Sequence, residues 1–123
     1  MIINKLSEVP VYEQLISETE REILCGILAE ETQIPSVREL SLTVGVNPNT
    51  IQKAYLELAR REEIIVSPGN GYFVAPGAKD RVRKREIARL IRLCSELCDF
   101  GISLDELLDA VQNAYKKKGE GHD

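Results

Sequence analysis

The sequence predicts a mainly α-helical protein with one small β-hairpin. Two observations support this fold class. Apolar residues recur at steps of three and four in five separate segments, which is typical of amphipathic helices. Between residues 64 and 74 this pattern gives way to two short β-type runs around a glycine-rich turn. We therefore predict a domain over residues 1–76, which contains the hairpin, and a helical tail over residues 77–123.

The first predicted helix spans residues 11–28. Pro10 precedes it, and the fixed φ of proline suits a helix start. Its apolar stripe is formed by Leu15, Ile16, Thr19, Ile23, Leu24, Ile27 and Leu28. The opposite face carries Glu13, Glu18, Glu20 and Glu22. We expect this acidic face to be solvated and to repel phosphate.

Two short helices with a tight turn between them come next. Ser36 and Glu39 have the spacing of a capping box, and Gly45 is suited to end the helix that they start. Asn47 is a favourable N-cap for the following helix, with Pro48 at its first position. The core-facing residues are Val37, Leu40 and Val44 in one helix and Ile51, Ala54, Tyr55 and Leu58 in the other. This pair has the outline of a helix-turn-helix.

The predicted hairpin joins strands at residues 64–66 and 72–74 through a tip at 67–71. A helix, a helix-turn-helix and a hairpin in this order are typical of a winged helix-turn-helix. Residues 75–78 contain proline and glycine, which break both adjoining patterns, so we predict a hinge there.

The tail begins with a basic run, residues 79–92, which contains seven lysines and arginines and only two acidic residues, Asp80 and Glu86. A long helix is predicted to end near residue 100, and a capping box of Ser103 and Glu106 starts a last helix. Residues 116–123 are expected to fray. Two helices cannot bury two apolar stripes alone, so we expect a homodimer with a four-helix dimerisation interface. The predicted interface residues are Ile87, Leu90, Ile91, Cys94, Leu97, Leu104, Leu107, Leu108 and Val111.

Length and composition exclude several classes of protein. A chain of 123 residues has no room for a large enzyme, and no segment is apolar enough to span a membrane. The first residues lack the features of a secretory signal, so we expect a cytoplasmic protein. The net charge of −4 argues against nucleic-acid binding at first sight, but residues 1–33 carry a net charge of −5 and residues 79–92 a net charge of +5, so the overall charge does not exclude a local DNA-binding face.

We predict no cofactor, no metal site and no disulfide. The three cysteines, Cys25, Cys94 and Cys98, lack the spacing of a disulfide framework. Cys94 and Cys98 are one helical turn apart, which could supply half of a metal site, but they fall on an apolar stripe and are expected to pack. The lone histidine, His122, has no cluster of carboxylates near it in sequence.

Three segments resemble a known family: residues 34–40 (IPSVREL), 45–51 (GVNPNTI) and 69–74 (GNGYFV). Together they are similar to the DNA-binding domain of GntR-family regulators, over residues 11–74. The Asn-Pro-Asn-Thr opening at 47–50 and the short tail resemble the YtrA branch. This resemblance implies a dimeric transcription regulator, with control of ABC-transporter genes. The sequence departs from the family pattern at three places. Around the start of the third helix, where arginines are common, it has Pro48, Asn49, Thr50 and Gln52. Glu63 replaces a glycine, and Pro68 and Asn70 occupy positions at the wing tip where basic or histidine side chains are common.

The resemblance and the helix positions predict the residues that contact DNA. The third helix presents its first side chains to base edges, and the paired donor and acceptor of Asn49 and Gln52 match adenine. Arg38 has the planar fork that binds guanine or phosphate. The predicted DNA-binding residues are Ser36, Arg38, Asn47, Pro48, Asn49, Thr50, Gln52, Lys53, Gly69, Asn70 and Gly71.

Each of these assignments has a structural alternative. Arg38 could pair with Glu39 or Glu57, and the wing glycines could serve the turn alone. The basic run at 79–92 could extend the DNA footprint, although a solvated face is the commoner role of such a run.

Alternatives also remain open for the whole protein. We expect a repressor that binds a palindromic operator, and the alternative is a winged helix that contacts another protein. A small-molecule effector, if one exists, is expected between the domain and the tail or at the dimer interface. Catalysis is not expected, because the chain is too short for the pyridoxal-phosphate aminotransferase that some relatives carry.

Overall fold

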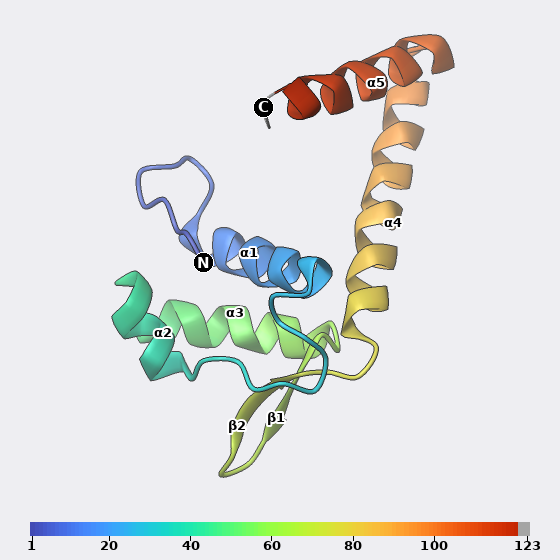
Figure 1. Cartoon of the computed structure of the whole chain (residues 1–123). Helices are drawn as coiled ribbons and strands as arrows, with labels where there is room; N and C mark the ends of the chain where they lie inside the picture. Colours follow the sequence, from blue (N-terminus) through green and yellow to red (C-terminus); the bar gives the residue numbers. More distant parts are fainter. Residues whose placement is uncertain (121–123) are drawn as a thin grey trace. The chain divides into compact units, whose positions relative to one another are not determined.

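The computed structural model describes residues 1–120, which form five helices and one antiparallel two-stranded sheet (Figure 1). The predicted fold class is confirmed. The helices are α1 (Val11–Cys25), α2 (Val37–Val44), α3 (Pro48–Arg60), α4 (Ala78–Asp99) and α5 (Leu104–Glu120). The strands are β1 (Ile64–Ser67) and β2 (Gly71–Val74). The chain divides into two compact units, Met1–Arg85 and a second that begins at Glu86.

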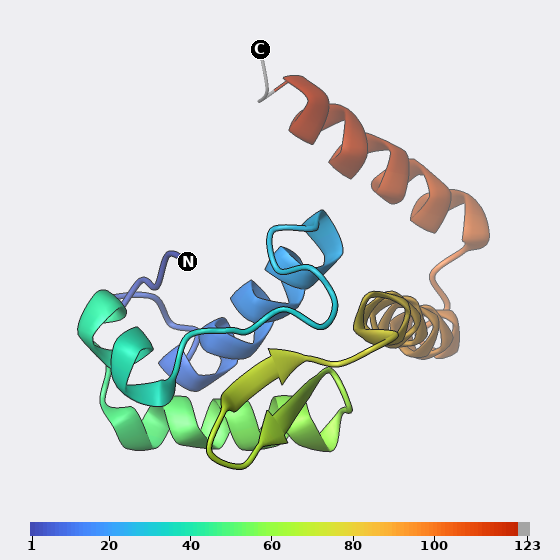
Figure 2. The ribbon, with the colours of Figure 1, turned by 60° about the horizontal axis from the view of Figure 1, so that its bottom comes forward.

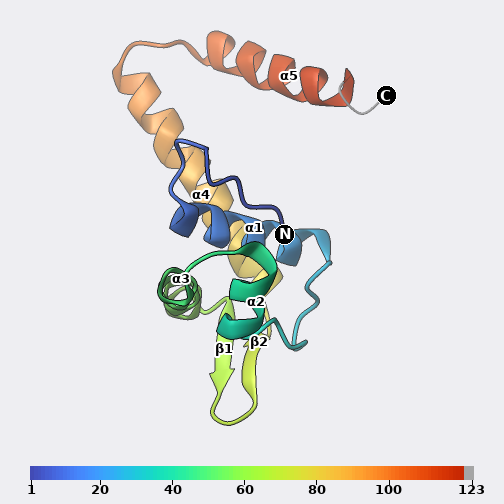
Figure 3. The same cartoon turned by 90° about the vertical axis from the view of Figure 1, so that its left-hand side faces the viewer.

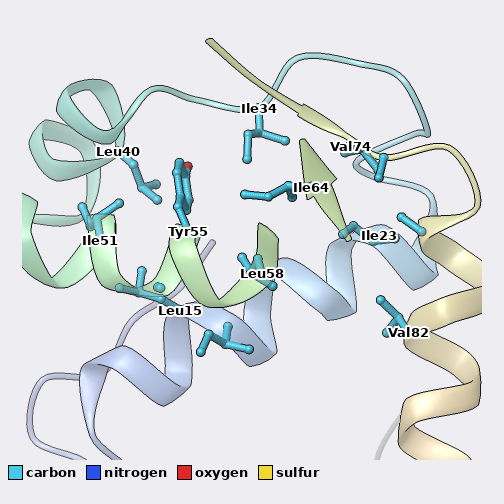
Figure 4. Packing of buried hydrophobic residues seen from close by; sticks show 14 of the residues in the cluster. Leu15, Ile23, Ile34, Leu40, Ile51, Tyr55, Leu58, Ile64, Val74 and Val82 are labelled. Carbon is cyan, nitrogen blue, oxygen red and sulfur yellow. The ribbon is translucent and has the colours of Figure 1, made fainter. Parts of the chain in front are cut away.

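The core of the first unit lies between α1, α2, α3 and the hairpin (Figure 4). The predicted inner stripe of α3 is fully confirmed, since Ile51, Ala54, Tyr55 and Leu58 are all buried. Leu40 of α2 is buried too, and Val37 and Val44 pack against the core as predicted. Burial of these stripes fixes which face of α3 remains open to the outside.

Local side-chain chemistry sets the ends of α2 and α3 as the sequence predicts. The hydroxyl of Ser36 accepts a hydrogen bond from the backbone N–H of Glu39 at 3.0 Å. The side-chain oxygen of Asn47 accepts one from the N–H of Asn49 at 2.8 Å. Gly45 ends α2 in the left-handed conformation, with φ of 68°. These caps place the turn of the helix-turn-helix at residues 45–47.

Replacing Gly45 by alanine should destabilise the protein by about 1 kcal/mol, because a residue with a Cβ is strained at this positive φ. The added Cβ would also meet the ammonium end of Lys5 at 2.9 Å, but that flexible side chain can move. Urea unfolding monitored by circular dichroism measures the change. Gly119→Ala in α5 is the control, since Gly119 has open space around it and should lose no stability.

Two expectations for α1 are wrong. The helix ends at Cys25 and not at residue 28, because Gly26 adopts a left-handed conformation with φ of 83°, and Ile27 is consequently exposed. Glu20 and Glu22, predicted to be solvated, are buried. An ion pair compensates each one: Arg61 binds Glu20 at 3.1 Å, and the amino group of Met1 lies 3.2 Å from Glu22.

The hairpin pairs Ile64 with Val74 and Ser67 with Gly71. Residues 31–34, for which the sequence predicts no strand, run along the other edge of β2. The N–H groups of Glu31 and Ile34 donate to the carbonyls of Val74 and Tyr72 at 2.9 and 3.0 Å. An isolated bridge joins Gln33 to Phe73. Both edges of β2 are therefore hydrogen-bonded, and the hairpin lies across α3 (Figure 2).

The predicted hinge at 75–78 is firmly packed. Ala75 and Ala78 are buried, and so is Val82 in the second turn of α4. The guanidinium of Arg81 donates to the carbonyl oxygens of Glu62 and Pro76 at 3.1 and 2.6 Å. The start of α4 therefore belongs to the first unit, which extends to Arg85 and beyond the predicted boundary at residue 76.

In the second unit, α4 and α5 meet at a turn with Gly101 at φ of 85°. The N–H of Ile102 donates to the carbonyl of Leu97 at 3.1 Å, as in a Schellman motif. The hydroxyl of Ser103 accepts from the N–H of Glu106 at 3.2 Å, which confirms the second capping box. Because α5 continues to Glu120, the predicted fraying of residues 116–120 is wrong. Residues 121–123, with His122, lie outside the described residues. None of the helices within residues 1–120 has the length and apolar character to cross a membrane.

Candidate nucleic-acid interface

Three elements meet at the predicted DNA-binding surface: the start of α2, the helix α3 and the hairpin (Figure 3). The hydroxyl of Tyr55 on α3 donates to the carbonyl of Pro35, just before α2, at 2.7 Å. The side-chain amide of Gln52 on α3 donates to the hydroxyl of Tyr72 on β2 at 3.3 Å. Two hydrogen bonds thus hold α3 to both of its neighbours.

Four residues at helical spacing form the outward ridge of α3: Asn49, Lys53, Leu56 and Arg60. All four are exposed. Thr50 and Gln52, predicted to contact bases as well, lie half-buried on the two flanks of the ridge. Leu56 and Arg60 were not among the predicted site residues, although their spacing from Lys53 places them on the same face. Asn49 and Lys53 are therefore the predicted DNA contacts on α3 that are most open to a ligand.

Arg38, on the first turn of α2, is exposed. The alternative pairings are not observed, since no acidic group forms an ion pair with Arg38 within residues 1–120. Glu57 instead binds Arg60 at 2.6 Å and Arg61 at 2.7 Å. Hydrogen bonds from these two arginines lower the pKa of Glu57 to about 2. The guanidinium of Arg38 is consequently free to bind an external acceptor.

The other residues predicted on α2 and at the start of α3 serve first as caps. Asn47 uses its side-chain oxygen for the cap of α3, and Pro48 occupies the first position of that helix. Ser36 accepts a hydrogen bond at its oxygen, so its hydroxyl proton is left to donate. Ser36 can therefore cap α2 and donate to a phosphate at the same time.

At the wing tip, Gly69 and Gly71 have φ of 82° and 107°, which the turn requires. A Cβ on Gly71 would lie 2.8 Å from the side-chain nitrogen of Gln33. That nitrogen donates to the carbonyl of Asn70 at 2.7 Å. The side chain of Asn70 turns back and donates to Ser67 at 3.2 Å. The predicted wing residues therefore have a structural role in the turn, and contact with DNA remains a prediction for them.

Comparison with known proteins identifies the class to which this surface belongs. Residues 11–74 match the family described as "Bacterial regulatory proteins, gntR family". The chain belongs to the GntR family. Over 127 residues it is 32% identical to the HTH-type transcriptional repressor YtrA of Bacillus subtilis (strain 168), and the alignment covers 98% of each chain. This similarity confirms the expected resemblance to the YtrA branch.

Solved structures agree with this assignment. A GntR family transcriptional regulator from Listeria monocytogenes is 31% identical with a TM-score of 0.69, over 87% of this chain and 96% of that one. AraR(DBD), solved in complex with operator ORX1, is 32% identical with a TM-score of 0.54, over 61% of this chain and 93% of that one. The protein is thus a winged helix-turn-helix transcription regulator that binds DNA.

The basic run of this GntR regulator is partly neutralised. Lys84 pairs with Asp80 at 2.9 Å, and Arg89 pairs with Glu86 at 2.8 Å. Arg81 lies 3.9 Å from Glu62. These pairs are exposed and contribute little to stability. They favour a solvated helix face over an added DNA contact for this part of the run.

A groove of about 580 Å³ lies beside the ridge of α3, between it and the start of α1. Its lining residues are Tyr12, Thr50, Lys53, Leu56, Glu57 and Arg60. Tyr12 was not predicted at this surface, because a single half-buried tyrosine at a helix start carries no distinctive pattern. In the part of the regulator that the structure describes, no three His, Cys, Asp or Glu residues lie close enough to hold a metal ion.

Proposed function

We propose that this GntR regulator is a repressor that binds a palindromic operator in the cytoplasm as a homodimer. The observation that carries the proposal is the exposed, unpaired Arg38 on the first turn of α2, the helix that packs against α3. Its planar set of donors suits a guanine edge or a phosphate, and its place in the helix-turn-helix distinguishes it from the exposed arginines of α4. The similarity to the repressor YtrA over nearly the whole chain supports a repressor.

In this proposal, two exposed side chains contact the bases. The amide of Asn49 matches the edge of adenine, which places A·T pairs beneath the start of α3. Arg38 contacts a guanine or a phosphate, and Lys53 and the hydroxyl of Ser36 position the DNA backbone without reading sequence. The net charge of −4 predicts that affinity for non-specific DNA is modest and falls steeply with salt.

The second unit supports a homodimer, because its apolar residues find little cover within one chain. Leu90 and Leu108 are 48% and 50% exposed, and Ile91 and Leu104 are more exposed still. Cys94, Leu97 and Leu107 are half-buried. An apolar surface of this extent on a small unit marks an interaction site. A second copy would cover it with the same stripes and would pair two DNA-reading units.

The regulated genes are proposed from the family resemblance. Members of the YtrA branch accompany ABC-transporter genes, so we propose that the operator lies upstream of a transporter operon. Footprinting of the region upstream of this gene and its neighbours tests that assignment.

Arg38→Ala should weaken binding to the operator about 5- to 150-fold, because a bidentate arginine contact is worth about 1–3 kcal/mol. Gel shift measures the loss, on a duplex selected from a random pool by the unmodified protein. Arg21→Ala is the control, because Arg21 is an exposed arginine of α1 that already pairs with Glu18 at 3.0 Å. Equal affinity of the Arg38 variant and the unmodified protein would favour the alternative, a winged helix that contacts another protein.

A further inference from the structure

Two glutamines hold the wing, the hairpin formed by β1 and β2, from two sides. Gln33 lies beside β2, bridges to Phe73 and donates to the carbonyl of Asn70 at the wing tip, at 2.7 Å. Gln52 lies on the flank of α3 and donates to the hydroxyl of Tyr72 at 3.3 Å. The second contact crosses between two elements that both belong to the DNA-binding surface, so it can set the angle between them.

Tyr72 is itself fixed in place. Its ring stands edge-on to the ring of Tyr55, with centroids 4.9 Å apart and planes at 66°. Tyr55 is buried and donates to the carbonyl of Pro35 at 2.7 Å. Burial raises the pKa of Tyr55 above its usual range, so this hydroxyl keeps its proton and remains a donor. The contact of Gln52 thus ends on a side chain that the core immobilises.

Gln52 and Asn49 differ in how freely they can meet a base. Asn49 is exposed on the ridge, and its side-chain amide has no hydrogen-bond partner within residues 1–120. Gln52 is half-buried and already donates to Tyr72. The hydrogen bond to Tyr72 uses one of the two N–H donors of the Gln52 amide and holds that amide toward β2, whereas the amide of Asn49 is free to turn toward a base. The two residues, similar in chemistry, are therefore suited to different tasks.

We propose that Gln52 and Tyr72 are positioning residues that fix the wing against the recognition helix α3, and that Gln52 does not read a base. The inference rests on the proposed DNA-binding function. A wing held in this position contacts phosphates or the minor groove, which adds affinity without sequence information. Loss of the link therefore lowers affinity for all sequences alike and leaves base preference unchanged.

The test uses the full chain with three variants, Gln52→Leu, Tyr72→Phe and the double variant, on a duplex selected from a random pool by the unmodified protein. Each single variant should weaken binding about fivefold, the value of one hydrogen bond. The double variant should be no weaker than either single variant, because both changes remove the same link. All three should select the same base sequence as the unmodified protein and show a shallower dependence of affinity on salt.

Asn49→Ala is the comparison, since the loss of a base-reading amide should change the selected sequence. The inference is overturned if Gln52→Leu changes the selected bases while Tyr72→Phe binds as the unmodified protein does. The inference is also overturned if the double variant binds more weakly than either single variant, by the product of the two single losses of affinity. Tyr72→Phe removes a single oxygen atom and keeps the ring, so it carries the test even if Gln52→Leu does not fold. Failure of the unmodified protein to select any duplex would instead overturn the proposed function.

Discussion

Replacing both Leu90 and Leu108 by aspartate should turn the regulator into a monomer and weaken its binding to a palindromic operator at least a hundredfold. Both side chains lie on the exposed apolar stripes of the second unit. In a symmetric dimer each substitution places two carboxylates in an apolar interface, at a cost of several kcal/mol. A monomer also loses the gain from linking two binding units, which is about 10² to 10⁴ in affinity.

Sedimentation velocity measures the oligomeric state, and gel shift on the selected duplex measures the affinity. Asn113→Asp is the matched control, because it adds a similar charge at an exposed position of α5 on the face opposite Leu108. Dimers that persist in the double aspartate variant would refute the proposed interface. An unmodified protein that sediments as a monomer at the concentration where it binds DNA would refute the homodimer altogether.

The elements of the helix-turn-helix could be predicted because the residues that define them lie within a few positions of each other. Ser36 and Asn47 cap the helices that begin next to them, and Gly45 ends α2. The core stripe of α3 follows from spacing alone. Local chemistry of this kind operates before any tertiary contact forms, so a single sequence reveals it.

The features that were missed depend on partners distant in sequence. Glu20 is buried because Arg61, which directly follows α3, supplies its ion pair. Residues 31–34 extend only because β2 offers them a free edge. Ala78 and Val82 lie within or beside the basic run, where their small apolar side chains form no obvious pattern, yet both enter the core. The role of Gln52 likewise changes once Tyr72 is placed beside it.

Glu63 is another residue whose surroundings depend on partners distant in sequence, and its carboxyl group is buried. Its side chain is 1% exposed, and one carboxyl oxygen has no hydrogen-bond partner within the described residues. Burial, together with the hydrogen bond and the negative charge of the neighbouring Glu20, raises the pKa of Glu63 to about 8. Arg61 and Arg85 oppose this shift without reversing it. Glu63 is consequently protonated at neutral pH and can donate to Glu20.

A raised pKa of this kind links stability to pH. In the unfolded chain Glu63 loses its proton near its ordinary pKa of 4.5, whereas in the folded protein it holds the proton up to about pH 8. Between these values the folded state binds more protons than the unfolded state, so the free energy of unfolding falls as pH rises. The contribution of Glu63 is fully present below pH 4.5 and is lost by about pH 8.

Glu63→Gln should therefore stabilise the protein at neutral and alkaline pH, by about 1–3 kcal/mol near pH 8, with much less effect near pH 5. Glutamine keeps the shape of the protonated acid, donates to Glu20 through its amide and never has to lose a charge on folding. Urea unfolding across this pH range gives the comparison, and Glu13→Gln, at an exposed position of α1, is the control. If the Glu63 and Glu13 variants both keep the pH dependence of the unmodified protein, the carboxyl of Glu63 is ionised in the folded state. In that case the partner of Glu63 is Arg61 or Arg85, which binds its carboxylate directly, and not Glu20.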